Sequence, residues 1–266
     1  MFKDDNLKFI SYVLAIGVLI ILTFCMMQVF ILGGDIPFLN ELGIGQGGSN
    51  KGEFSYEDPP QKIIKEDKDY QAIIKTNLGS FTIELYEENA PNTVNNFVFL
   101  SSEGFYDGVK VHRVLKDFLF QTGDRYTLTD NKTLYGTGGP GYVFSDEINW
   151  ESLNLEASTL QSLAAAGYVS TPGLISKPLQ KFSIAMANSG PNSNGSQFFI
   201  VTADNTDKKL DDIKGKYTVF GKVVDGFDTI ESINSAEVDI SNKNAPLPYK
   251  DIVISRIDIV ELEKNL

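Results

Sequence analysis

The sequence has little cysteine, little histidine and a shortage of positive charge, and each shortage excludes a class of protein. Cys25 is the only cysteine, so an intramolecular disulfide is impossible, and with His112 as the only histidine the usual Cys/His zinc sites are excluded. The 35 acidic residues outnumber the 23 basic ones, which gives a formal net charge of -12. An acidic surface repels phosphate backbones, so we do not expect nucleic acid as a partner.

The rest of the composition is that of a folded protein with an apolar core. Hydrophobic residues make up 42% of the chain and charged residues 22%, which is the balance of a globular protein rather than a disordered one. The 18 Phe and 11 Tyr residues allow a dense core. With 266 residues, the chain can form one sizeable domain and additional segments.

A long apolar run without a charged residue covers residues 9–32, after a short tail of residues 1–8. At about 1.5 Å per residue, a helix of this length spans a hydrocarbon core of roughly 30 Å. A cleaved signal peptide fits less well, because the run is too long and no small-residue cleavage site follows it. Lipid modification of Cys25 fits poorly too, since Phe24 is bulky where a small residue is needed. We therefore predict a transmembrane helix.

The basic residues around this run predict its orientation. Lys3 and Lys8 precede it, whereas no Lys or Arg follows before Lys51. By the positive-inside rule, the amino terminus is inside and the main domain is extracytoplasmic. We therefore expect a single-pass protein of the cell membrane.

Two further segments follow the apolar run. Residues 33–68 are rich in Gly, Ser, Pro and mixed charge, which predicts a flexible linker. Residues 69–266 read as one domain, in which residues 70–77 and 80–86 have the pattern of a hairpin. Further strand-like runs and only two long helical patterns, after Ala90 and at residues 226–234, favour a β-barrel or a sandwich, and the pattern alone does not choose between them.

Residues 111–124 contain a charged side chain within an apolar, strand-like run. Because side chains alternate between the faces of a strand, Arg113 is expected to share a face with Leu115, while His112 and Val114 take the other. An arginine whose stem covers apolar surface is the simpler interpretation of this residue alone. The alternative is a guanidinium presented beside an apolar pocket.

This run and three others together resemble the cyclophilin family, in the same order and over residues 69–260. The matching residues are His112-Arg113 with Phe118, Gln121 and Gly123-Asp124; Gly136 to Tyr142, as in bacterial members; Met186 to Asn188 with Gly190 to Asn192 and Asn194 to Phe199; and Thr218 to Gly221 with Val223.

The resemblance implies an all-β-dominated fold, a closed eight-stranded antiparallel β-barrel capped by two α-helices. It also implies peptidyl-prolyl cis/trans isomerisation of X-Pro bonds, without a cofactor or metal. The expected partners are proline-containing peptides or unfolded protein clients, and the apolar run would place this folding activity near a membrane surface. A non-catalytic proline-peptide-binding or scaffold module on the same fold is the alternative.

The resemblance also assigns the site residues. Arg113 is the catalytic donor to the prolyl nitrogen, Gln121 orients it, and Asn188 holds the preceding carbonyl through its backbone. Ala187 and Gln197 line the neighbouring groove. The expected proline cup consists of Phe118, Leu119, Phe199 and Leu210.

Two positions depart from the family, and one segment is added. Tyr217 takes the place of the family's active-site histidine, and Lys209 stands where many members carry a tryptophan that helps to bind cyclosporin. We therefore expect weak inhibition by that drug. Residues 148–181 form an insertion with a short helical pattern that ends at Gly167, and we favour a structural role for it over a role in substrate selection.

Overall fold

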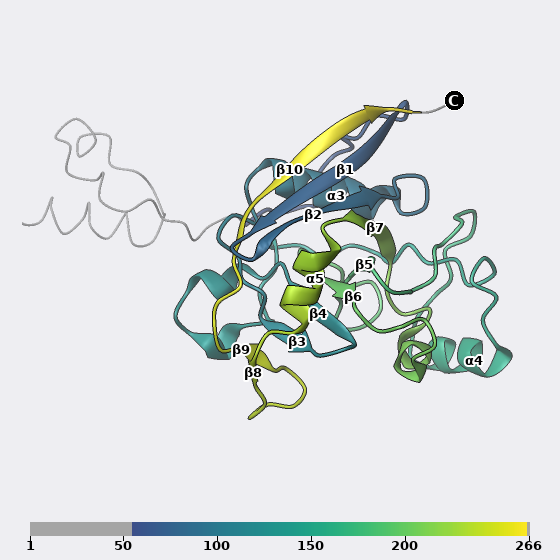
Figure 1. Cartoon of the computed structure of the whole chain (residues 1–266). Coiled ribbons are helices and arrows are strands. Elements are labelled where there is room, and N and C mark those ends of the chain that lie inside the picture. The colour runs from purple at the N-terminus through teal and green to yellow at the C-terminus, as the bar shows by residue number, and fades with distance from the viewer. Residues whose placement is uncertain (1–54, 265–266) are drawn as a thin grey trace, which may run out of the picture. The chain divides into compact units, whose positions relative to one another are not determined.

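The computed structural model describes residues 55–264 and shows an antiparallel sheet with helices packed on it (Figure 1). The expected tail of residues 1–8, the transmembrane helix at 9–32 and the first part of the linker lie outside the described residues. Within residues 55–264, no helix is both long and apolar enough to cross a bilayer.

The main sheet has eight strands in the order β10-β1-β2-β7-β5-β6-β4-β3, and β8 pairs with β9 in a second, two-stranded sheet. The strands are β1 (Lys68–Thr76), β2 (Gly79–Leu85), β3 (Arg113–Leu115), β4 (Leu119–Thr122), β5 (Ser183–Met186), β6 (Phe198–Val201), β7 (Val219–Asp225), β8 (Val238–Asp239), β9 (Leu247–Pro248) and β10 (Ile254–Glu263). The helices are α3 (Pro91–Ser102), α4 (Ala157–Ala165) and α5 (Phe227–Asn234). This arrangement confirms an all-β-dominated fold with a few helices.

One face of the sheet carries the main core. In β1 the alternate residues Ala72 and Ile74 are fully buried, and the predicted hairpin with β2 pairs Thr76 with Gly79. Helix α3 packs Val94 and Phe97 into the same core, as the helical spacing of these residues predicts.

Helix α5 buries two isoleucines and leaves its first residue exposed. Ile230 and Ile233 are fully buried, but Phe227 is 40% exposed and its ring packs 4.7 Å from that of Phe182. The helix lies where the pattern at residues 226–234 predicts it, and its burial increases from its first residue to the two isoleucines.

The predicted closure of the barrel is also wrong, because the edge strands β3 and β10 do not pair with each other. The segment before β3 meets the start of β10 in an irregular stretch, where Val111 N–H donates to Ile252 O at 2.9 Å. Strand β3 has only three residues, and its Val114 N–H donates to Pro246 O at 2.9 Å in the loop before β9. A proline has no N–H to return, so a regular ladder does not form there.

Residues 55–67, which the composition assigned to the linker, lie against α3. The Asn95 side-chain oxygen accepts the N–H groups of Ile63 and Ile64, at 2.7 and 3.2 Å. Tyr56 N–H donates to Pro140 O at 2.8 Å, and its ring packs edge-on at 5.2 Å from that of Phe99. The folded domain thus includes residues before 69.

The insertion at residues 148–181 packs its apolar residues on the chain that leads into β7. Helix α4 ends at Ala165, and Gly167 follows it with φ +86°, as the glycine predicts. The indole N–H of Trp150 donates to Gly215 O at 3.3 Å. Figure 1 shows α4 well away from β1 and β10, at the end of the domain that carries the insertion.

Candidate functional site

Strand pairing brings the central predicted residues into one row across the sheet. Arg113 of β3 is opposite Gln121 of β4, which is opposite Phe199 of β6. The row continues through Ala185 of β5 to Val219 of β7. Directly opposite residues share a face of a sheet. The site therefore lies on the face opposite the main core, as the predicted pairing of Arg113 with Leu115 on one face requires.

Two oxygen acceptors hold the Arg113 guanidinium on the sheet. Its Nη1 donates to Gln121 Oε1 at 3.2 Å, and its Nε donates to Asn244 O at 2.7 Å. The side chain is half-buried, and this burial lowers the pKa of Arg113, with the nearby Tyr217 opposing the shift. An arginine remains charged under any ordinary condition, so the site retains a fixed cation.

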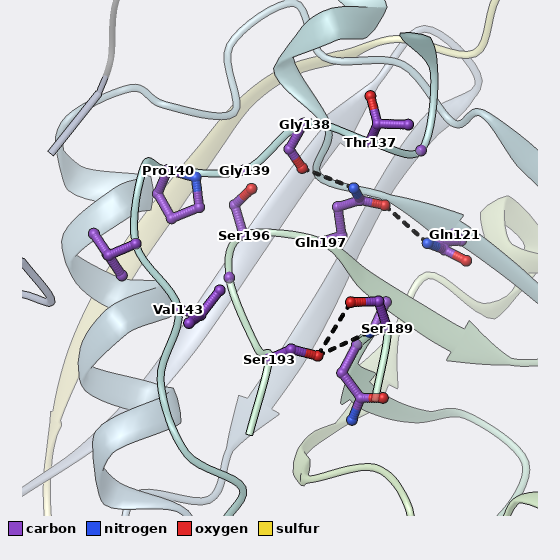
Figure 2. Close-up of a pocket in the computed structure, with 15 residues that line it drawn as sticks. Gln121, Thr137, Gly138, Gly139, Pro140, Val143, Ser189, Ser193, Ser196 and Gln197 are labelled. Atoms are coloured by element: carbon purple, nitrogen blue, oxygen red, sulfur yellow. Dashed lines mark hydrogen bonds between the residues drawn. The ribbon is translucent and has the colours of Figure 1, made fainter. Parts of the chain in front are cut away.

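A chain of amide groups extends from this arginine to a glycine-rich loop. Gln121 Nε2 donates to Gln197 Oε1 at 2.9 Å, and Gln197 Nε2 donates to Gly138 O at 2.8 Å. Figure 2 shows these two bonds in sequence. The predicted role of Gln121 in orienting the arginine is consistent with this geometry, because its amide is fixed at both ends.

The predicted proline cup consists of residues that lie in one apolar cluster. Phe199 is 3% exposed, Leu210 is 2% exposed, and Phe118 is partly buried against them. The Tyr217 ring meets the Phe199 ring edge-on at 5.2 Å. We call the set of Phe118, Leu119, Phe199, Leu210 and Tyr217 the apolar patch.

Lys209 is a neighbour of the apolar patch. Its ammonium lies 5.8 Å from the centre of the Phe118 ring, a distance at which a cation and an aromatic face attract each other. The sequence showed only that a lysine replaces a tryptophan here, and the structure places its charge over the patch.

A pocket of about 430 Å³ is lined by Gln121, the partner of Arg113, and by both predicted groove residues. Ala187, Asn188 and Gln197 line it together with residues from 136 to 143. Figure 2 shows Gln197 beside Gly138 of that loop. The Asn188 side chain turns toward Lys216 O, to which it donates at 2.9 Å. The Asn188 side chain is therefore engaged within the domain, and the contact of its backbone with a substrate carbonyl stays a prediction.

His112 lies on the strand face opposite Arg113 and is buried. Burial is the largest cause that lowers the pKa of His112 to about 4, while the charge of Asp124 opposes the shift and that of Arg113 adds to it. The imidazole is therefore neutral at pH 7, which favours the structural role that its position indicates. Among residues 55–264, no group of three or more His, Cys, Asp or Glu side chains could hold a metal ion.

We expect His112 to destabilise the domain as the pH falls from about 6.5 toward 4. The pKa in the folded chain is about 4 against an ordinary 6.5, so the unfolded chain takes up the proton first and is favoured in that window. Between pH 7 and pH 5 the wild type should lose about 2 kcal/mol more unfolding free energy than His112→Gln does.

Urea denaturation of both proteins at the two pH values measures this difference. Other groups, such as Glu87, whose pKa burial raises to about 7, titrate equally in both proteins and cancel. An equal loss in the two proteins would show that His112 is not held in the neutral form.

Comparisons with known proteins agree on one family. Residues 71–259 match the model of the family described as cyclophilin type peptidyl-prolyl cis-trans isomerase/CLD. The chain is 33% identical over 222 residues to a putative peptidyl-prolyl cis-trans isomerase of Staphylococcus epidermidis, which covers 74% of this chain and 94% of that protein. It is 34% identical over 194 residues to a peptidyl-prolyl cis-trans isomerase of Arabidopsis thaliana, with 72% and 94% covered.

Solved structures give the same answer. A crystal structure of a cyclophilin type isomerase of Cryptosporidium parvum aligns with a TM-score of 0.53 and 30% identity, covering 72% of this chain and 98% of that one. A second structure of the same protein, in the presence of the dipeptide Ala-Pro, aligns with a TM-score of 0.52.

Proposed function

Because this chain belongs to the cyclophilin family of peptidyl-prolyl cis/trans isomerases, we propose that Arg113 and the apolar patch catalyse rotation about X-Pro bonds in peptides and unfolded protein clients. The isomerase activity is that of the family and of the similar proteins. The Cryptosporidium protein was crystallised in the presence of Ala-Pro, which supports proline-containing peptides as the partners of this chain too.

The reaction requires stabilisation of a twisted amide and no bond to be broken. Resonance gives the peptide C–N bond a rotation barrier of about 18–20 kcal/mol. As the bond twists, the prolyl nitrogen becomes pyramidal and regains its lone pair. A fixed donor to that nitrogen binds the twisted state better than the planar one, and this difference is what accelerates the reaction.

The orientation of the Arg113 guanidinium is the observation that carries this proposal. Gln121 and Asn244 accept from Nη1 and Nε, whereas Nη2 donates to none of residues 55–264. The guanidinium is thus held at two of its three nitrogens, and it belongs to the sheet face that carries the apolar patch. A proline ring on the patch would bring its nitrogen near a preorganised donor, which needs no reorganisation during the reaction.

We further propose that the apolar run at residues 9–32 anchors the enzyme in the cell membrane, with residues 69–266 on the extracytoplasmic side. The length of the run and the distribution of Lys3, Lys8 and Lys51 support this location. The enzyme would then assist the folding of exported clients near the membrane surface. Fractionation of cells should recover the full chain with membranes after a high-salt wash, and recovery in the soluble fraction would contradict the anchor.

Exchange NMR on a short X-Pro peptide tests the catalytic proposal. Uncatalysed isomerisation takes roughly tens to hundreds of seconds, so catalysis by the purified full chain is detected as line broadening or exchange peaks. A peptide that is bound without any faster exchange would indicate the non-catalytic scaffold instead.

The lysine at position 209 also leads to a prediction about inhibition by cyclosporin. We expect weak inhibition of the wild type, because an ammonium over Phe118 replaces the broad apolar surface of a tryptophan. Lys209→Trp should bind the drug about ten-fold more tightly or better, since burial of an aromatic side chain is worth roughly 1.5–3 kcal/mol. Titration of isomerase activity with cyclosporin measures both constants, and tight inhibition of the wild type would contradict the prediction.

A further inference from the structure

A second pocket lies on the side of the domain where the insertion packs. Its volume is about 490 Å³, and it opens between the insertion and the chain that leads into β7. We call it the side pocket. Its lining residues come from three segments, and those used below are Leu155, Thr159, Lys177, Leu179, Tyr217 and Val219.

The wall that the insertion contributes is fixed by close packing on Gly215. A Cβ atom at this position would lie 2.7 Å from Leu163 Cδ1 and 2.8 Å from Leu155 Cδ1, so only glycine permits the contact. The backbone of Gly215 has φ +74°, which also favours glycine. With the bond from Trp150 to Gly215 O, these contacts fix the insertion against the chain that leads into β7.

The side pocket borders the apolar patch. Tyr217 lines the side pocket, and its ring also meets Phe199 of the patch. Leu179 and Val219 line the pocket and belong to the same apolar cluster as the patch. A single side chain, Tyr217, therefore belongs both to the lining of the side pocket and to the apolar patch.

Three of the four charged residues that line the side pocket have partners in the domain, whereas Glu156 is exposed. Lys214 forms an ion pair with Asp211, and the Lys177 ammonium lies 5.5 Å from the centre of the Tyr86 ring. The inner lining is apolar, from Leu155, Leu179 and Val219. An apolar floor with a polar rim accepts an apolar group rather than an ion.

We propose that the side pocket binds an apolar side chain, of the size of Leu or Phe, from the same client polypeptide whose proline lies on the apolar patch. This inference rests on the proposed function and adds a sequence preference to it. An extended chain advances about 3.3 Å per residue, so a residue two to four positions from the proline can reach past Tyr217. The insertion would thus select among X-Pro sites by what stands near them.

A set of peptides with one X-Pro bond tests the proposal. In each peptide, Phe stands two, three or four residues before or after the proline. A matched peptide carries Ser in place of that Phe. With the full chain, we expect one placement to raise kcat/KM about ten-fold over its Ser counterpart, as burial of an aromatic side chain predicts.

Two matched variants on α4 locate the effect. Thr159→Trp would fill the side pocket and should abolish the preference for Phe, while kcat/KM for the Ser peptide stays unchanged. Ser162→Trp places the same side chain one turn away, outside the pocket lining, and should keep the preference.

Each outcome bears on one hypothesis. Equal rates for all Phe and Ser peptides, or a preference that persists in Thr159→Trp, would overturn the side-pocket proposal. If the full chain accelerates no peptide at all, the catalytic proposal fails instead. The affinities of the Phe and Ser peptides, measured by fluorescence titration after labelling, then test the side-pocket proposal without catalysis. If Phe-containing peptides without proline bound as tightly as those with proline, the side-pocket proposal would also be overturned.

Discussion

Arg113→Ala is expected to lower kcat/KM for X-Pro isomerisation about 10²–10³-fold, the effect of removing one preorganised donor from a transition state. The loss should fall on kcat, with KM nearly unchanged, because Phe118, Leu119 and Phe199 of the apolar patch still bind the proline ring. The measurement is peptide isomerisation by NMR exchange over a range of substrate concentrations.

Two controls make this result specific. Arg113→Lys retains the charge but not the planar donors that Gln121 and Asn244 orient, so it should recover only a small part of the loss. Arg256→Ala removes an exposed arginine that pairs with Asp258 on β10, and it should leave the rate unchanged. Equal rates for the wild type and Arg113→Ala would remove Arg113 from the mechanism.

The second large effect is expected on stability, at Glu147. Helix α3 has Ala90 before its first turn and hence no side-chain cap of its own. The buried Glu147 carboxylate supplies one from outside the helix, accepting the N–H groups of Asn92 and Thr93 at 3.0 and 2.8 Å. It also accepts the Thr93 hydroxyl at 2.7 Å. Anionic oxygens at a helix N-terminus are favoured by the unpaired N–H groups and the helix dipole.

Glu147→Leu should lower the free energy of unfolding by about 3 kcal/mol, since several buried donors lose a charged acceptor together. Glu147→Gln retains one acceptor oxygen and should lose about half as much. Urea denaturation monitored by circular dichroism gives both values. Glu151→Ala, at an exposed position four residues later, is the control and should change little. A loss below about 0.5 kcal/mol in Glu147→Leu would contradict this account of the helix start.

The sequence predicts the position of a side chain best where the alternation of a strand decides which face of the sheet it lies on. The alternation around Arg113 predicts its face, and strand pairing then places it beside Gln121 and Phe199. The resemblance to a family adds Leu210 and Tyr217, which no local pattern would connect with the arginine.

Contacts through backbone atoms are not predictable in this way. Asn244 holds Arg113 through its carbonyl oxygen, a group that every residue has, across 131 positions of sequence. The open edge of the sheet depends on whether Val114 N–H finds its acceptor in β10 or at Pro246, and the two acceptors are alike in chemistry. The side pocket forms only because the insertion packs on Gly215, and a glycine alone does not indicate its neighbour.

The docking of residues 55–67 on α3 bears on how the enzyme can be produced for these measurements. A fragment that starts at residue 69 would deprive the Asn95 oxygen of two donors and uncover the ring of Phe99. It would also remove Tyr56, whose N–H donates to Pro140 O in the loop that lines the pocket in Figure 2. A truncated version should therefore begin before Ser55, because a shorter one exposes aromatic surface that favours aggregation.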